Sequence, residues 1–95
     1  MNNAVVKKLK ELKPILQEKY GIEEFALFGS MSRDDYTAQS DIDIAILKSN
    51  KNDFFLRIEA IEFLKMKFNR EVDMGYFNSM KTFIKNRIQK DFIYV

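Results

Sequence analysis

The sequence predicts a small α/β domain, because amphipathic helical stripes alternate along it with apolar runs of strand length. Three observations carry this prediction. First, a helical stripe occupies residues 3–20. Second, two apolar runs between residues 24 and 47 flank a Gly-Ser turn and an Asp-x-Asp pair. Third, a second helical stripe and the apolar run that follows it together span residues 54–77. At this length we expect one domain over residues 1–95.

The composition bounds the chemistry that is available. The chain is 46% hydrophobic and 32% charged, which is typical of a folded protein, and its net charge of +2 gives no strong case for nucleic-acid or membrane binding. It contains no Cys and no His, so disulfides, thiolate metal sites and the commonest general base are excluded. Reactive groups must therefore be carboxylates, hydroxyls, Lys or Arg. With no membrane-length apolar run and no secretory leader pattern, we expect a cytoplasmic protein.

The first helix is predicted by apolar residues that recur at steps of four and three. They are Val5, Leu9, Leu12, Leu16 and Tyr20. Pro14 lies inside this stripe, which predicts either one kinked helix or two abutting helices. Gly21 is a plausible helix stop, and Glu24 to Phe28 is expected to form a short buried strand.

The central segment places a tight turn and two acids between two apolar runs. The first run ends at Gly29-Ser30, and after ten residues Asp41 and Asp43 open the second run. Because side chains alternate along a strand, the two acids share one face while the isoleucines between and after them point into the core. Adjacent carboxylates are costly unless a cation lies near them, and Mg²⁺ prefers such oxygen ligands. The glycine lets the backbone approach a phosphate closely.

A polar loop over residues 48–52 follows, and Asp53 is a reasonable cap for the next helix. The apolar stripe of that helix consists of Phe54, Ile58, Ile61, Leu64 and Phe68. We expect this stripe to face the core, with Phe55 and Phe63 at its exposed fringe. The helix is expected to end at Asn69-Arg70.

The remaining chain predicts a third strand, a helix and an apolar end. Glu71 to Phe77 is the expected strand, in which Asp73 faces away from its apolar neighbours. Asn78 or Ser79 is expected to cap a last helix with a basic outer side. The closing residues 92–95 are apolar and predict an edge strand or a patch for a partner.

The motif Gly29-Ser30, ten residues, Asp41-Ile42-Asp43 resembles the signature of the DNA polymerase beta nucleotidyltransferase superfamily. The short chain and its LFGS and SDIDIAI segments resemble the minimal nucleotidyltransferases (MNT), many of which are encoded beside a HEPN-domain ribonuclease and act as its antitoxin. The resemblance implies a nucleotidyltransferase fold, with a small mixed sheet of three to four strands packed with about four helices.

The resemblance also implies a set of site residues. Asp41, Asp43 and Asp73 correspond to the three carboxylates that hold Mg²⁺, two ions in all, and act in catalysis, with Glu71 as a rival for the third position. ATP is the implied substrate. The implied nucleotide-binding residues are Gly29, Ser30, Arg33 and Ser40.

Two residues of the phosphate loop depart from the family pattern Gly-Ser-Arg-x-Arg-Gly. Met31 stands where the first arginine is expected, and Asp34 replaces the second glycine. One cationic partner for a triphosphate is therefore missing. Arg33 matches the second arginine, but it is equally well interpreted as a surface residue or as a partner of Asp34 or Asp35.

The resemblance implies transfer of AMP from ATP to a hydroxyl side chain, a tyrosine, of a HEPN toxin. Two alternatives remain open. In the first, the domain is an inactive or weakly active module that caps the toxin sterically. In the second, the acceptor is RNA or a small molecule such as an aminoglycoside; the modest net charge speaks against RNA, and the length of 95 residues leaves little room for a drug-binding cleft.

Overall fold

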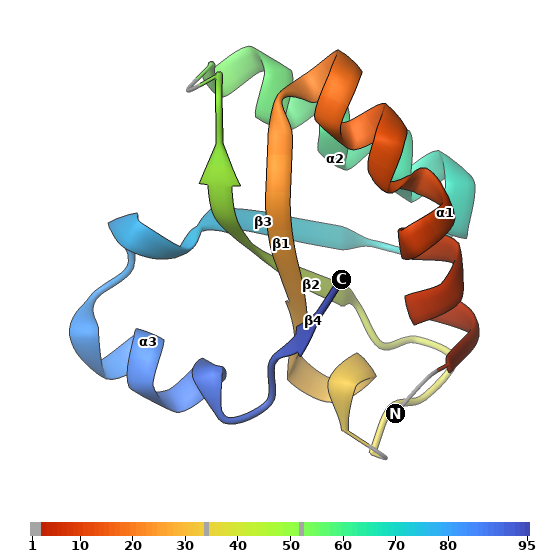
Figure 1. Cartoon of the computed structure of the whole chain (residues 1–95). Helices are drawn as coiled ribbons and strands as arrows, with labels where there is room; N and C mark the ends of the chain where they lie inside the picture. Colours follow the sequence, from red (N-terminus) through yellow and green to blue (C-terminus); the bar gives the residue numbers. More distant parts are fainter. Residues whose placement is uncertain (1–2, 34, 52) are drawn as a thin grey trace.

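A computed structural model describes residues 3–33, 35–51 and 53–95 (Figure 1). The chain runs in the order α1 (Asn3–Tyr20), β1 (Ile22–Phe28), β2 (Ile42–Ser49), α2 (Phe54–Phe68), β3 (Val72–Tyr76), α3 (Thr82–Gln89) and β4 (Ile93–Tyr94). Two short 3-10 segments, η1 (Gly29–Ser32) and η2 (Phe77–Ser79), follow β1 and β3. The expectations for Asp34 and Asn52 lie outside the described residues.

The strands form one mixed sheet in the order β3-β2-β1-β4. β1 pairs antiparallel with β2 and with β4, whereas β2 and β3 are parallel. The predicted mixed sheet of three to four strands is therefore confirmed, and its edge next to β1 is the predicted apolar end of the chain, with Leu27 opposite Ile93. The described residues contain three α-helices and the two 3-10 segments in place of the expected four or so helices.

The hydrophobic core lies between the sheet and the pair α1 and α2, which pack side by side on one side of the strands (Figure 1). The predicted stripe of α1 is confirmed, since Val5, Leu9, Leu16 and Tyr20 are buried and Leu12 packs against them. α1 is a single helix that includes Pro14, and Gly21, with a φ of +70°, ends it.

The predicted inner face of α2 is wrong at the N-terminal end of the helix. Phe54 is 59% exposed and Ile58 is 39% exposed, whereas Ala60 and Leu64 are buried and Leu56 packs against the core. Phe63 also packs inward, on the ring of Tyr20 at 5.6 Å between centroids. The helix begins with three consecutive apolar residues, so the helical period fits more than one possible inner face. The small side chain of Ala60 lets the helix backbone approach the core closely, which favours the face that contains Ala60. The cap by Asp53 is confirmed, because its side chain accepts hydrogen bonds from the N–H groups of Phe55 and Leu56.

The last helix also begins later than expected. Asn78 and Ser79 lie in η2, and α3 starts at Thr82 after Lys81, which makes no side-chain cap. No residue of Thr82–Gln89 is buried, and in Figure 1 α3 lies on the other side of the strands from α1 and α2. The face of the sheet opposite the main core is therefore covered only in part.

Candidate active site

Three aspartates lie at the start of the two parallel strands, on the sheet face opposite α1 and α2. Asp43 of β2 and Asp73 of β3 are register partners across the parallel pair, and Asp41 immediately precedes β2. Ile42 and Ile44 are buried in the core while Asp43 between them is half-buried. The predicted alternation is confirmed, because the acids and the core residues occupy opposite faces of these strands.

The carboxylates influence one another. Partial burial, followed by the charges of Asp73 and then Asp41, raises the pKa of Asp43 from 3.8 to about 6, and Arg33 acts in the opposite direction. Burial and like charges both disfavour the ionised form of an acid. The site therefore holds more negative charge than its own residues neutralise, which is the electrostatic condition for binding a cation.

These residues fit Mg²⁺ in ligand type and charge, since they supply hard carboxylate oxygens at a point of unbalanced negative charge. As they stand, the side chains in the described part of the chain do not form a group of three metal-ligating residues. Glu71 is engaged elsewhere, because Lys65 Nζ lies 3.3 Å from its Oε2 and its side chain is 71% exposed. Asp73, in register with Asp43, is the better placed third carboxylate.

The glycine turn lies directly against Asp43. Gly29 has a φ of +75°, and a Cβ atom at this position would collide with the Asp43 carboxylate. Ser32 Oγ donates a hydrogen bond to the carbonyl of Gly29 at 2.8 Å, and the N–H of Arg33 donates to the carbonyl of Ser30 at 3.1 Å. Glycine is required here both for its conformation and for its lack of a side chain, so the turn and the acids form one site.

Met31 is fully buried, with an exposed fraction of 0%, and belongs to the core cluster. The side chain at the position of the family's first arginine therefore anchors the turn to the protein interior. The sequence predicts that a cation is missing at this position. The structure shows that the methionine in its place holds η1 against the core.

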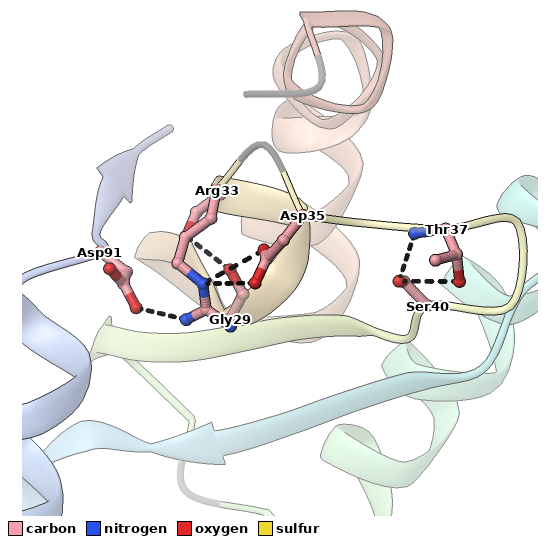
Figure 2. Close-up of polar contacts among 7 residues, drawn as sticks. Gly29, Arg33, Asp35, Thr37, Ser40 and Asp91 are labelled. Atoms are coloured by element: carbon pink, nitrogen blue, oxygen red, sulfur yellow. Dashed lines mark hydrogen bonds and ion pairs between the residues drawn. The ribbon is translucent and has the colours of Figure 1, made fainter.

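Arg33 lies between two carboxylates, as Figure 2 shows. Its Nε donates to Asp35 Oδ1 at 3.2 Å and its Nη1 to Asp91 Oδ2 at 2.7 Å. The sequence suggested Asp35 as a partner and gave no sign of Asp91, which is 58 residues away and carries no motif.

Ser40 shapes the loop that leads into β2. Its Oγ accepts from the N–H of Thr37 at 2.7 Å (Figure 2), and its own N–H donates to the Thr37 carbonyl at 3.1 Å. Arg70 Nη1 donates to the carbonyls of Ala38 and Ser40 at 2.8 and 3.0 Å, with a longer bond to Thr37. Arg70 thus holds the approach to Asp41, a role that sequence reasoning missed because Arg70 was interpreted only as a helix end.

A cavity of about 470 Å³ opens at the far ends of β2 and β3. It is lined by residues 46–49 and by Tyr76, Asn78 and Ser79. None of the three aspartates borders it. The acidic site lies apart from this cavity, beside the glycine turn.

A mixed sheet with a pair of aspartates at the start of one strand, a third aspartate on the parallel neighbour and a glycine turn against the pair is the arrangement of a nucleotidyltransferase. Residues 9–95 match the family model described as the nucleotidyltransferase domain, and the chain belongs to this family. The expectation of a nucleotidyltransferase enzyme is thus confirmed.

Relatives and solved structures refine this assignment. A relative from Methanocaldococcus jannaschii, named as a protein adenylyltransferase, is 37% identical over 92% of this chain and 90% of its own length. The protein adenylyltransferase MntA of Thermococcus cleftensis is 29% identical over 84% of this chain and 81% of its own.

Among solved structures, one described as a minimal nucleotidyltransferase matches with a TM-score of 0.76 at 16% identity, covering 98% of this chain and 95% of the other. A toxin–antitoxin structure with AMP-PNP matches with a TM-score of 0.61 at 29% identity, over 87% and 62% of the two chains. The resemblance to minimal nucleotidyltransferases is therefore confirmed.

No helix among the described residues is long and apolar enough to cross a membrane.

Proposed function

We propose that the protein is a Mg²⁺-dependent adenylyltransferase of the cytoplasm that moves AMP from ATP to a tyrosine hydroxyl of a HEPN toxin and so neutralises it. The observation that carries this proposal is the contact of the Gly29 turn with the Asp43 carboxylate, in register with Asp73. It is supported by relatives named as protein adenylyltransferases and by similarity to a toxin–antitoxin structure with AMP-PNP.

Asp41, Asp43 and Asp73 would hold two Mg²⁺ ions. When bound, the ions neutralise charge on the phosphates and lower the proton affinity of the attacking hydroxyl. The aspartates orient the acceptor hydroxyl for attack, and Asp73, which is exposed on β3, accepts its hydrogen bond. With no His in the chain, carboxylates are the groups that suit this role.

The turn holds the nucleotide on the other side of the reacting phosphorus. The N–H groups and hydroxyl at Gly29-Ser30, with the Arg33 guanidinium, bind the β and γ phosphates and leave the α-phosphorus in line with the hydroxyl. The tyrosine oxygen forms a bond to the α-phosphorus, the bond from that phosphorus to the bridging oxygen breaks, and pyrophosphate leaves with the negative charge. The hydroxyl proton passes to a carboxylate or to water.

A second candidate function is a binding cap that blocks the toxin without catalysis. The observation that favours it is the environment of the phosphate loop, where Met31 is buried and the Arg33 guanidinium is engaged by two carboxylates. On this view the fold is retained while nucleotide affinity is reduced.

A transfer assay distinguishes the two functions. The protein is incubated with α-labelled ATP, Mg²⁺ and the product of the neighbouring gene, in parallel with the Asp41→Asn/Asp43→Asn variant. Labelled toxin that requires Mg²⁺ and both aspartates supports the adenylyltransferase, and peptide mapping identifies the acceptor side chain. Absence of label, together with tight binding of the variant to the toxin, contradicts it and leaves the cap.

A further inference from the structure

The contact between Arg33 and Asp91 joins the phosphate loop to the end of the chain. The distance from Arg33 Nη1 to Asp91 Oδ2 is 2.7 Å, shorter than the 3.2 Å from Arg33 Nε to Asp35 Oδ1. Asp91 is also the more enclosed carboxylate, with a side chain 27% exposed against 64% for Asp35. Short charge-assisted hydrogen bonds to a partly enclosed carboxylate restrict a guanidinium more than bonds to an open one.

Asp91 is held by the body of the fold. Its N–H donates to the carbonyl of Ile88 at 3.0 Å, and the next ring, Phe92, packs on Phe28 at 6.1 Å and on Phe77 at 5.5 Å between centroids. Phe28 is the last residue of β1, directly before the glycine turn. The carboxylate is therefore fixed relative to the turn, whereas Asp35 lies in the exposed loop after it.

The contacts with Asp35 and Asp91 leave part of the Arg33 guanidinium available. An arginine has five N–H donors in a rigid plane, and the bonds to Asp35 and Asp91 use the Nε hydrogen and one Nη1 hydrogen. The Arg33 side chain is 47% exposed, so a ligand can reach it. An arginine of this exposure would otherwise lose considerable rotamer freedom on meeting a phosphate.

We propose that Asp91 is a positioning residue that holds the Arg33 guanidinium beside the Gly29–Ser32 turn, with its remaining donors ready for the phosphates of ATP. Asp91 acts through Arg33 and does not touch the nucleotide. This inference rests on the proposed function, and it links the segment between α3 and β4 to the nucleotide site through Arg33.

The test is the affinity for ATP with Mg²⁺, measured by titration calorimetry on the intact protein. We expect Asp91→Asn to weaken binding about three- to tenfold, the range expected when one rotamer-rich side chain loses its prior ordering. Asp35→Asn, the matched control on the same guanidinium, has a smaller effect. Asp91→Glu, which keeps the charge, restores part of the lost affinity.

A double-mutant cycle separates positioning from a general structural role. In the Arg33→Gln background the same Asp91→Asn change alters affinity by less than about twofold, because the group through which Asp91 acts is gone. An equal loss in both backgrounds contradicts the inference and assigns Asp91 to the stability of the C-terminal segment. Tighter binding by Asp91→Asn also overturns it, since Asp91 would then compete with phosphate for Arg33. If the unaltered protein fails to bind ATP, the proposed function itself fails and the inference with it.

Discussion

Replacing Asp43 with asparagine is expected to stabilise the folded protein while abolishing transfer. Asp43 is half-buried beside Asp73 and Asp41, and no described residue donates a hydrogen bond to its carboxylate that the amide would lose. The substitution keeps the shape of the side chain and removes a charge that the fold disfavours.

The magnitude follows from the pKa of Asp43, which burial and its neighbours raise from 3.8 to about 6. A shift of about two units corresponds to roughly 3 kcal/mol for a fully enclosed group. Because Asp43 is partly exposed to solvent, which screens the charge, we expect about 1–2 kcal/mol at pH 7.5. For a domain of this size that is a rise in Tm of about 4–10 °C.

The pH dependence identifies the cause. The folded state binds the Asp43 proton more tightly than the unfolded state does, so the stability of the unaltered protein falls as pH rises from about 4 to about 6. Asp43→Asn lacks this fall. The difference in Tm between the two proteins is therefore absent near pH 3.5 and complete above about pH 7.

The assay is thermal unfolding in metal-free buffer, followed by circular dichroism from pH 3.5 to 8. Asp73→Asn is the companion variant, because it removes the second largest cause of the raised pKa and lowers the pKa of Asp43 only in part. A less stable Asp43→Asn variant at pH 7.5, or a difference in Tm that is the same at pH 3.5 and pH 7.5, would refute the reasoning.

Three further predictions follow from the same site. Mg²⁺ raises the Tm of the unaltered protein and leaves that of Asp43→Asn almost unchanged, as measured by scanning calorimetry; equal shifts would place the ion elsewhere. Gly29→Ala lowers the free energy of unfolding by more than about 1 kcal/mol, because it combines a positive φ with a clash, while Gly75→Ala changes it little in urea titrations. Met31→Arg, which restores the family residue, lowers the free energy of unfolding by about 3 kcal/mol or more. The control Met66→Arg, at a 73% exposed position, changes that free energy by less than about 0.5 kcal/mol. An arginine tolerated at position 31 would contradict the anchoring role of Met31.

The sequence was most informative where a local rule decides the outcome. Alternation along a strand was enough to place Asp43 and the neighbouring isoleucines on opposite faces, and the glycine before Ser30 indicated the tight turn. The capping of α2 by Asp53 is equally local. These features depend on residues within a few positions of one another, so a local sequence pattern is enough to predict them.

The features that the sequence did not indicate depend on contacts between distant segments. Arg70 and Asp91 are unremarkable in sequence, and only the folded chain brings them to the loop after β1. The face of α2 was misassigned for a related reason, because packing against the sheet selects Ala60 over the larger Ile58. Met31 shows the converse. The loop motif indicates that an arginine is missing there, but the burial of Met31 in the core depends on packing that a loop motif does not describe.

The most direct test of the central claim is a crystal structure of the protein with Mg²⁺ and a non-hydrolysable ATP analogue. The account predicts the β and γ phosphates on the N–H groups of the Gly29-Ser30 turn, with metal density between Asp43 and Asp73. Phosphates bound in the cavity beside Lys48 and Asn78, with no metal at the aspartates, would contradict it.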